Sequence, residues 1–351
     1  MSRTTKGDQI IEYFMGQLRH GDLKRGQKIQ SEYELAEMFS VNKTTANKAV
    51  ARLVDRGFLK RCRGGAGTIV AKTTDYPIGT IAFVIALQNI SFQPHLLRGG
   101  QRAAFVRHYR TEYIHPSPRE EEDHFWQMVC DSGIDGLITF GNFPPPDLPF
   151  PVMFVDTLPR SEDRAKRNWV ISDNRHGGYL IGRHLCEMGH TNPVFAPATH
   201  LKDTLAGQRA MGFIDALREA GIENPEDHLF PVQVDDTHIA ACMDRACKVS
   251  PEITAIAFDR DQNAMLAIAA LKERGLSIPR DMSVTGYGRL DEFSESRLTS
   301  IDQHPQELSF RAMDLLIDLI EGKATAPIQE MLPVELYSGD TVAALARSRR
   351  A

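Results

Sequence analysis

The chain has 351 residues, 42% of them hydrophobic and 25% charged, with a formal net charge of −5. This length predicts two or three domains, and the composition is that of a globular protein rather than a disordered or fibrous one. No apolar run approaches the roughly 18–20 residues of a membrane helix. The first residues do not resemble a secretory signal either, so we expect a cytoplasmic protein without a membrane partner.

Charge is distributed unevenly along the chain. Residues 1–75 hold 14 Lys and Arg against 8 Asp and Glu, whereas the remainder holds 27 against 38. A basic head on an acidic body is typical of a protein that contacts a polyanion through the head alone, although a solvated basic surface has the same composition. The five cysteines are scattered without a CxxC pair, which argues against a disulfide framework or a zinc site.

The first part of the chain predicts three helices. Apolar residues recur at helical spacing in 8–20, and Ser31 with Glu34 forms an S-x-x-E capping box before a short second helix. Asn42 can cap a third helix that Gly57 ends. Two helices joined by three residues form a helix-turn-helix, and the polar, basic start of the later helix suits entry into a major groove.

Two strands are predicted after the third helix. Residues 58–62 and 68–71 flank a glycine-rich turn, where Arg61 and Arg63 supply charge for DNA phosphates or a narrow minor groove. A nucleotide-cradling loop is the alternative, but this turn leads into a strand and lacks the phosphate-loop pattern. We therefore expect an α+β winged helix-turn-helix in residues 1–74 and a linker in residues 75–78.

Residues 79–351 alternate short apolar runs with helical patterns. The expected strands are 81–87, 136–140, 152–156, 193–196, 229–234, 255–258 and 283–287, and the expected helices are 96–108, 120–132, 177–189, 205–220, 237–249 and 262–275. Such alternation predicts parallel sheets covered by helices. We expect an α/β domain of two lobes that binds a ligand between them, beyond the carboxyl ends of the strands.

Residues 8–71 resemble the GntR-type winged helix-turn-helix. The resemblance rests on Ile29, Ser31-Glu32, Glu34-Leu35-Ala36, Phe39, Val41, Thr44-Thr45, Ala49-Val50, Leu53, Gly57 and Gly65-x-Gly67-Thr68-x-Val70. With the two wing arginines, the DNA-binding set that it implies is Ser31, Tyr33, Lys43, Thr44, Thr45, Asn47, Lys48, Arg61, Arg63, Gly65, Gly67 and Thr68.

Three of these positions differ from the family's usual pattern. Tyr33, Lys43 and Asn47 stand where that family commonly has arginine, and Lys does not replace Arg in bidentate contacts to guanine. We therefore expect a different operator. Packing of Tyr33 between helices is the alternative to a DNA contact.

The remainder resembles the LacI-type regulatory domain, whose fold is that of periplasmic sugar-binding proteins. The matching segments are Phe92, Arg98-Gly99-Gly100, Asp173–Tyr179, His184–His190, Arg209–Leu217, Thr254–Phe258, Asp261–Ala264, Ile278–Tyr287 and Leu298–Ile301. The resemblance implies effector contacts at Phe92, Arg209, Arg260 and Asp261, with His176 nearby; a surface position is the alternative for Arg209. An aromatic face covers an apolar sugar or base ring, and charged groups hold polar substituents.

Two effector positions depart from that family's pattern. Arg260 replaces the usual asparagine, and Gly288 replaces the usual aspartate that holds sugar hydroxyls. Both changes add positive character, so we expect an acidic or phosphorylated sugar derivative rather than a plain neutral sugar.

These features favour a ligand-responsive transcription regulator, and the combination resembles the architecture of arabinose-responsive repressors. By that analogy we expect a repressor that binds a palindromic double-stranded operator as a homodimer and responds to a sugar or sugar derivative. A solute-binding transport protein would explain only the C-terminal part. We expect no enzyme, because hydrolase and metalloprotease motifs are missing. We also expect no cofactor and no metal, since His184 and His190 are six residues apart and fall off one helix face.

Overall fold

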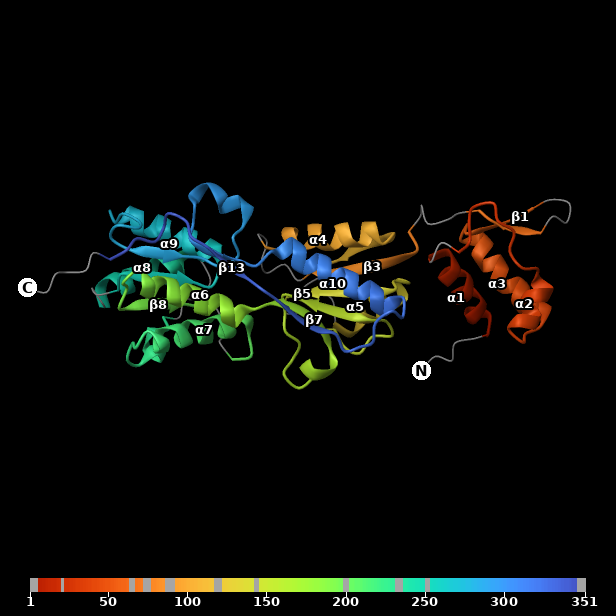
Figure 1. The fold of residues 1–351 in the computed structure, drawn as a ribbon, viewed down its shortest axis with the longest axis horizontal. Coiled ribbons are helices and arrows are strands. Elements are labelled where there is room, and N and C mark those ends of the chain that lie inside the picture. The colour runs from red at the N-terminus through yellow and green to blue at the C-terminus, as the bar shows by residue number, and fades with distance from the viewer. Residues whose placement is uncertain are drawn as a thin grey trace, which may run out of the picture.

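The computed structural model describes residues 6–19, 22–62, 67–71, 77–85, 92–116, 122–141, 145–197, 202–230, 236–249 and 253–345. They form a small head followed by two lobes in a row (Figure 1). None of the helices in these ranges is long and apolar enough to cross a membrane.

The head has the three helices and the hairpin that its sequence predicts. They are α1 (Lys6–Arg19), α2 (Glu32–Met38), α3 (Lys43–Asp55), β1 (Leu59–Arg61) and β2 (Thr68–Val70). The strands pair antiparallel, with Leu59 opposite Val70. Fully buried Phe14, Leu35 and Leu53 pack the three helices together.

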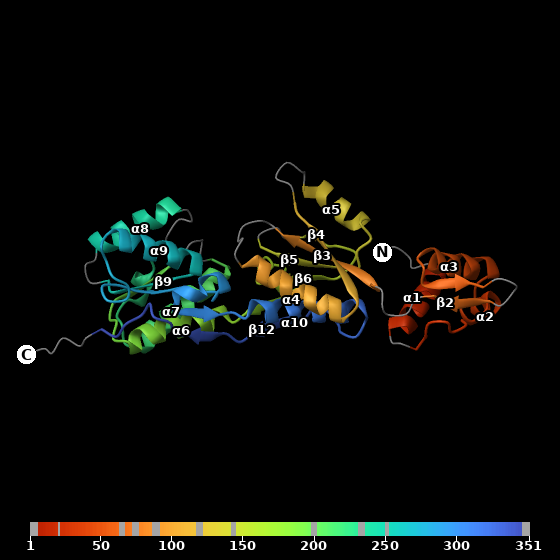
Figure 2. The same ribbon diagram turned by 90° about the horizontal axis from the view of Figure 1, so that it is seen from above.

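The first lobe is built on a six-stranded sheet in the order β12-β7-β6-β5-β3-β4, with every neighbouring pair parallel. Its elements are β3 (Gly79–Ile85), α4 (Gln93–Val106), β4 (Tyr109–Ile114), α5 (Glu122–Asp131), β5 (Gly136–Phe140), β6 (Val152–Val155), β7 (Asn168–Ser172), α10 (Pro305–Ile320) and β12 (Gln329–Leu332). Ile81 and Phe83 share a core with α4 and α10, whereas Ala82 and Val84 face α5 on the other side (Figure 2). Successive side chains of β3 point to opposite faces of the sheet, and helices cover both faces, so the apolar residues of this central strand follow one another without alternation.

The second lobe has a three-stranded parallel sheet in the order β10-β9-β8. Its elements are α6 (Asn174–Glu187), β8 (Pro193–Ala196), α7 (Leu205–Glu219), α8 (Asp236–Val249), β9 (Ala255–Phe258), α9 (Asp261–Glu273) and β10 (Ser283–Thr285), together with the short 3-10 helices η3 (Pro225–His228) and η4 (Asp291–Ser296). A further 3-10 helix, η2 (Arg164–Lys166), belongs to the first lobe. Phe195 packs with α6 and α7, whereas Ile256 packs with α8 and α9.

The chain crosses between the lobes three times. It passes from β7 into α6, returns from β11 (Ser300–Asp302) into α10, and leaves again from β12 into β13 (Glu335–Tyr337). β11 and β13 pair antiparallel beside the second lobe. Three crossings that meet at one place form a hinge, so each lobe is assembled from segments far apart in the sequence.

The parallel α/β architecture is confirmed, but the predicted elements were incomplete. The apolar pattern does not predict β4, β7, α10 or β11–β13. Two of these, β4 and β12, are the edge strands of the first sheet, where exposed polar residues interrupt that pattern. In the expected strand 229–234, Leu229 forms a single bridge to Phe195, and residues 231–235 lie outside the described ranges.

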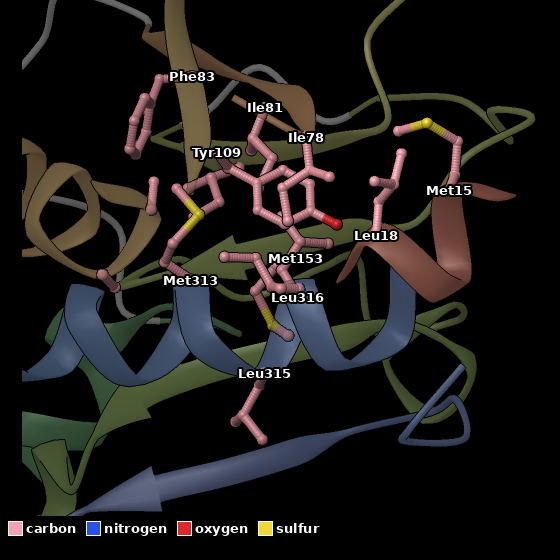
Figure 3. Packing of buried hydrophobic residues seen from close by; sticks show 14 of the residues in the cluster. Met15, Leu18, Ile78, Ile81, Phe83, Tyr109, Met153, Met313, Leu315 and Leu316 are labelled. Atoms are coloured by element: carbon pink, nitrogen blue, oxygen red, sulfur yellow. The ribbon is translucent and has the colours of Figure 1, made fainter. Parts of the chain in front are cut away.

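The head rests on the first lobe through α1. Met15 and Leu18 belong to the same buried cluster as Ile78 and Tyr109, and the four side chains lie in one region of that core (Figure 3). Residues 72–76, which include half of the expected linker, lie outside the described ranges, but Ile78 is a packed residue. The apolar contact therefore makes the head's position dependent on the first lobe.

Candidate functional site

Ser31 and Glu34 fix the start of α2. The Ser31 Oγ accepts a hydrogen bond from the Glu34 N–H at 3.3 Å, and the Glu34 carboxylate accepts one from the Ser31 N–H at 2.7 Å. These bonds lower the pKa of Glu34 and form the predicted capping box. Ser31 thus acts first as a helix cap, at the edge of the candidate DNA surface.

The first two turns of α3 hold five of the twelve predicted DNA contacts. Asn42 Oδ1 accepts hydrogen bonds from the Thr45 N–H at 2.7 Å and from the Thr45 hydroxyl at 2.8 Å. Thr45 therefore points back toward the cap, whereas Lys43 and Thr44 are exposed in the first turn and Lys48 is exposed in the second. A helix N-terminus with exposed lysines favours a phosphate or the edge of a base.

Tyr33 lies beside this turn. Its side chain is 68% exposed, and the Lys43 Nζ sits 3.8 Å from the centroid of its ring. The alternative in which Tyr33 packs between helices does not match this exposure. The aromatic ring and the cation form one projecting unit at the junction of α2 and α3.

The wing is tied to α3 by Arg61. Its guanidinium donates a hydrogen bond to the Asn47 Oδ1 at 2.8 Å and lies 3.7 Å from the Glu32 carboxylate. Lys28 is a further residue of this surface that was not predicted. Its backbone forms an antiparallel β-bridge with Ile69, and its side chain reaches Gly67, where an added Cβ would lie 2.6 Å from the Lys28 Cε. Lys28 precedes the capping box in a loop, so no periodic pattern marked it.

The structure places the remaining wing residues differently from one another. Thr68 is buried, so its side chain does not belong to the exposed surface. Gly67 has φ +90°, a backbone conformation that favours glycine. Arg63 and Gly65 lie outside the described residues. The exposed candidates that the structure brings together on α2, α3 and β1 are Tyr33, Lys43, Thr44, Lys48 and Arg61.

A cavity of about 540 Å³, here called the cleft, lies between the lobes. Its walls come from the carboxyl ends of β5, β6, β9 and β10 and from the first turns of α4 and α7. Phe92, Arg209 and Arg260, three of the five predicted effector residues, line it. This is the place where open parallel sheets bind small ligands.

Arg209 is held rigidly in the wall of the cleft. Its Nε donates to the Asn174 Oδ1 at 2.7 Å, its Nη1 donates to the Asp259 carbonyl at 2.6 Å, and its guanidinium lies 3.9 Å from the centroid of the Tyr287 ring. Helices α6 and α7 approach each other so closely here that a Cβ added to Gly178 would lie 1.9 Å from the Arg209 carbonyl oxygen. With 8% of its surface exposed, Arg209 is not the surface arginine of the alternative interpretation.

Arg260 is the more accessible cation. It occupies the N-cap position of α9, and its side chain is 29% exposed, with the Nε 4.0 Å from an oxygen of the buried Asp259 carboxylate. The other Asp259 oxygen accepts a bond from Asn263 at 3.2 Å. The Arg260 guanidinium can therefore turn toward a ligand and remain close to the Asp259 carboxylate.

Asp156 is a cleft residue that the sequence analysis missed. It follows β6 with φ +47°, and its Oδ1 lies 3.4 Å from the Gln303 Nε2. Burial raises the pKa of Asp156 to about 6, while Arg209, the Gln303 hydrogen bond and Arg260 act in the opposite direction. An acidic residue that ends an apolar strand was the available signal.

Two predicted effector residues do not reach the cleft. Asp261 is buried on the other side of its helix turn, where its carboxylate accepts bonds from the Ser300 hydroxyl at 2.6 Å and the Leu290 N–H at 2.9 Å. His176 is exposed on α6, with its ring 6.1 Å from that of Tyr179. No group of three or more His, Cys, Asp or Glu side chains with metal-binding geometry occurs within the described ranges.

Comparison with known proteins follows the same division of the chain. Residues 6–70 match the family model of bacterial regulatory proteins of the gntR family, and residues 183–342 match that of a periplasmic binding protein-like domain. An arabinose metabolism transcriptional repressor of Halalkalibacterium halodurans is 27% identical over 345 residues, which cover 90% of each chain. A transcriptional repressor PurR of Mannheimia succiniciproducens is 34% identical over 175 residues, 49% of this chain and 51% of the relative.

Solved structures share the fold. A transcriptional regulator CelR in complex with cellobiose superposes with a TM-score of 0.66 at 20% identity, covering 86% of this chain and 91% of the other. A LacI family regulator from Enterococcus faecium with bound ribose superposes with a TM-score of 0.65 at 23% identity, covering 76% of this chain and all of the other.

Proposed function

We propose that this protein, a gntR-family DNA-binding head joined to a periplasmic-binding-protein-like domain of the LacI type, is a transcription repressor controlled by a small ligand. The observation that carries the proposal is the cleft, in which Phe92, Arg209 and Arg260 converge from both lobes. The repressor relative that spans 90% of the chain supports it. Such a protein acts in the cytoplasm by binding DNA and a small ligand, and this function needs no catalytic group.

The head binds DNA through α3 and the wing. Lys43, Lys48 and Arg61 supply charge for phosphates, while Thr44 and Asn47 present polar groups to base edges. A single recognition helix reads only about 3–5 base pairs, so two heads on a palindromic operator supply the specificity.

The second head comes from a homodimer. Phe105 is 82% exposed at the end of α4, and Tyr113 is 48% exposed on the edge strand β4. Apolar side chains at a sheet edge that pairs with no further strand among the described residues favour contact with a second copy.

Ligand binding changes the DNA affinity through the hinge. A ligand that contacts Phe92 in the first lobe and Arg209 or Arg260 in the second stabilises the closed arrangement. Because Met15 and Leu18 of α1 pack on the first lobe, the lobe rotation moves the head. The ligand shifts the equilibrium by its differential affinity for the two states, typically about 1–3 kcal/mol.

The ligand is an acidic or phosphorylated sugar derivative. Arg260 offers a partly exposed guanidinium for an anionic group, and Asp156 offers an acceptor for hydroxyl groups opposite it. The similar proteins include a repressor of arabinose metabolism and regulators with bound cellobiose and ribose, and these three neutral sugars are the comparison compounds.

Calorimetric titration of the full chain tests this assignment. We expect sugar acids or sugar phosphates to bind, and Arg260→Ala to weaken binding about tenfold, the value of one charged hydrogen bond. Arg183→Ala removes an exposed arginine of α6 outside the cleft and serves as the matched control. Tight binding of neutral sugars alone, unaffected by Arg260→Ala, would refute the acidic ligand.

A further inference from the structure

A second cavity lies at the hinge. This hinge pocket has a volume of about 610 Å³ and is bounded by α4 and the first turns of α10 on one side and by η4, β11 and β13 on the other. Its lining includes Arg102, Arg289, Phe293, Phe310 and Tyr337. Among the described lining residues it shares Leu290 alone with the cleft, so the two cavities are separate.

Arginines in the hinge pocket lie over aromatic rings. The Arg102 guanidinium is 6.0 Å from the centroid of the Phe310 ring, and the Arg289 guanidinium is 4.3 Å from that of Tyr337. Phe293 of η4 adds a third ring to the wall. A pocket that offers ring faces and guanidinium groups side by side suits a ligand with a planar ring and an anionic group.

Most carboxylates of the hinge pocket already accept hydrogen bonds from neighbouring groups of the chain. Asp302 accepts a bond from Arg289 at 2.6 Å and another from the His304 N–H at 2.8 Å, and Asp261 is buried under its own hydrogen bonds. Arg297 pairs with Asp340 at 2.7 Å, whereas no carboxylate of the described ranges forms an ion pair with the exposed Arg102. Glu307 is the lining carboxylate that remains exposed. Arg102 is therefore the cation best placed to meet a ligand.

We propose that the hinge pocket is a second effector site, which binds a small aromatic or heterocyclic anion such as an aryl phosphate. Arg102 and Phe310 of the first lobe contact it from one side, and Arg289 and Phe293 of the second lobe contact it from the other. This site is additional to the cleft and does not depend on which sugar the cleft binds.

Occupancy of the hinge pocket regulates the cleft. The pocket takes its walls from both lobes, so its shape changes when the lobes rotate about the three crossings. A ligand that fits one arrangement better than the other changes the cleft's affinity, and the cleft ligand changes the pocket's affinity by the same factor.

Calorimetric titration of the full chain with phenyl phosphate tests the pocket. Inorganic phosphate carries the charge without the ring, and benzyl alcohol carries the ring without the charge. We expect both to bind at least about tenfold more weakly than phenyl phosphate, and Arg102→Glu to weaken phenyl phosphate by about tenfold or more. Phe310→Leu removes the ring beneath the guanidinium and should weaken phenyl phosphate but leave inorganic phosphate unchanged.

Two variants serve as controls. Arg183→Glu reverses an arginine that also lies over an aromatic ring, 5.7 Å from the centroid of Tyr179, but on α6 outside both cavities. Arg260→Ala changes the cleft. Both should bind phenyl phosphate as the parent does. The proposal is overturned if Arg102→Glu and Arg183→Glu bind it equally, if Arg260→Ala alone abolishes binding, or if phenyl phosphate does not bind at about 10 mM.

Discussion

The head and the cleft use cationic side chains in opposite ways. Lys43 and Lys48 project from the start of α3 into solvent, whereas Arg209 is almost fully buried and bonded to Asn174 and the Asp259 carbonyl. A polyanion is bound by hydrated cations that displace its counter-ions, while a small ligand needs groups that are already desolvated and oriented. Changes in the head should therefore alter binding with little effect on folding, and changes in the cleft should alter both.

The largest effect that this comparison predicts is on operator affinity. Lys43→Ala removes a contact from each of two heads, and we expect operator binding to weaken about 30-fold or more, because two contacts at about 1–3 kcal/mol each sum to about 2–6 kcal/mol. Fluorescence anisotropy on a duplex recovered by selection from genomic fragments measures it. Lys272→Ala, an exposed lysine of α9, is the control, and the thermal midpoint of both variants should match the parent. Equal operator affinities would place DNA recognition elsewhere on the head.

The next effect concerns the half-buried Asp156 carboxyl of the cleft. Because the pKa of Asp156 is raised to about 6 by burial, the folded chain keeps a proton between pH 4 and 6 that the unfolded chain has released. The free energy of unfolding of the parent therefore falls as the pH rises through this window, and Asp156→Asn should escape that loss, gaining about 2 kcal/mol relative to the parent between pH 4 and 7.

Urea unfolding at a series of pH values measures this difference. Asp147→Asn changes a carboxylate that is 98% exposed and should show no such trend. A constant difference between Asp156→Asn and the parent across the series would mean that Asp156 has its ordinary pKa.

The smallest expected effect is on the stability of the head and concerns the Asn42 cap of α3. Asn42→Ala removes the acceptor of the Thr45 N–H at the start of α3, which should cost about 1 kcal/mol of stability. Asn42→Asp keeps an acceptor there and should retain most of it. Thermal unfolding of the head, followed by circular dichroism, separates the two variants. If both lose stability alike, the cap does not hold the recognition helix.

The same contrast explains what the sequence made predictable. In the head, the capping box at Ser31 and the caps at Asn42 and Gly57 are local signals, and the structure has all three. In the sensor domain, β12 and β13 are short, polar segments whose strand character comes from pairing with β7 and β11. Such pairing is a long-range contact, which periodicity does not encode.

The cleft residues divide in the same manner. Arg209 lies in the second turn of α7, the helix that follows β8, so its position followed from the βα pattern. Asp261 also opens a helix, but its carboxylate turns away from the cleft, where it accepts hydrogen bonds from the Leu290 N–H and from the Ser300 hydroxyl, 39 residues along the chain. Local pattern can place a residue near a strand end, but tertiary hydrogen bonds decide which way its side chain points.

The three crossings between the lobes also determine which lobe can complete its fold first during translation. The first lobe begins at Gly79, yet it lacks the covering helix α10 and the edge strand β12 until Leu332 has left the ribosome. The second lobe, by contrast, has all of its central strands once Thr285 has emerged. A nascent chain must therefore hold an uncovered apolar sheet while the later lobe is made, and premature termination before α10 should yield aggregates rather than a shortened sensor.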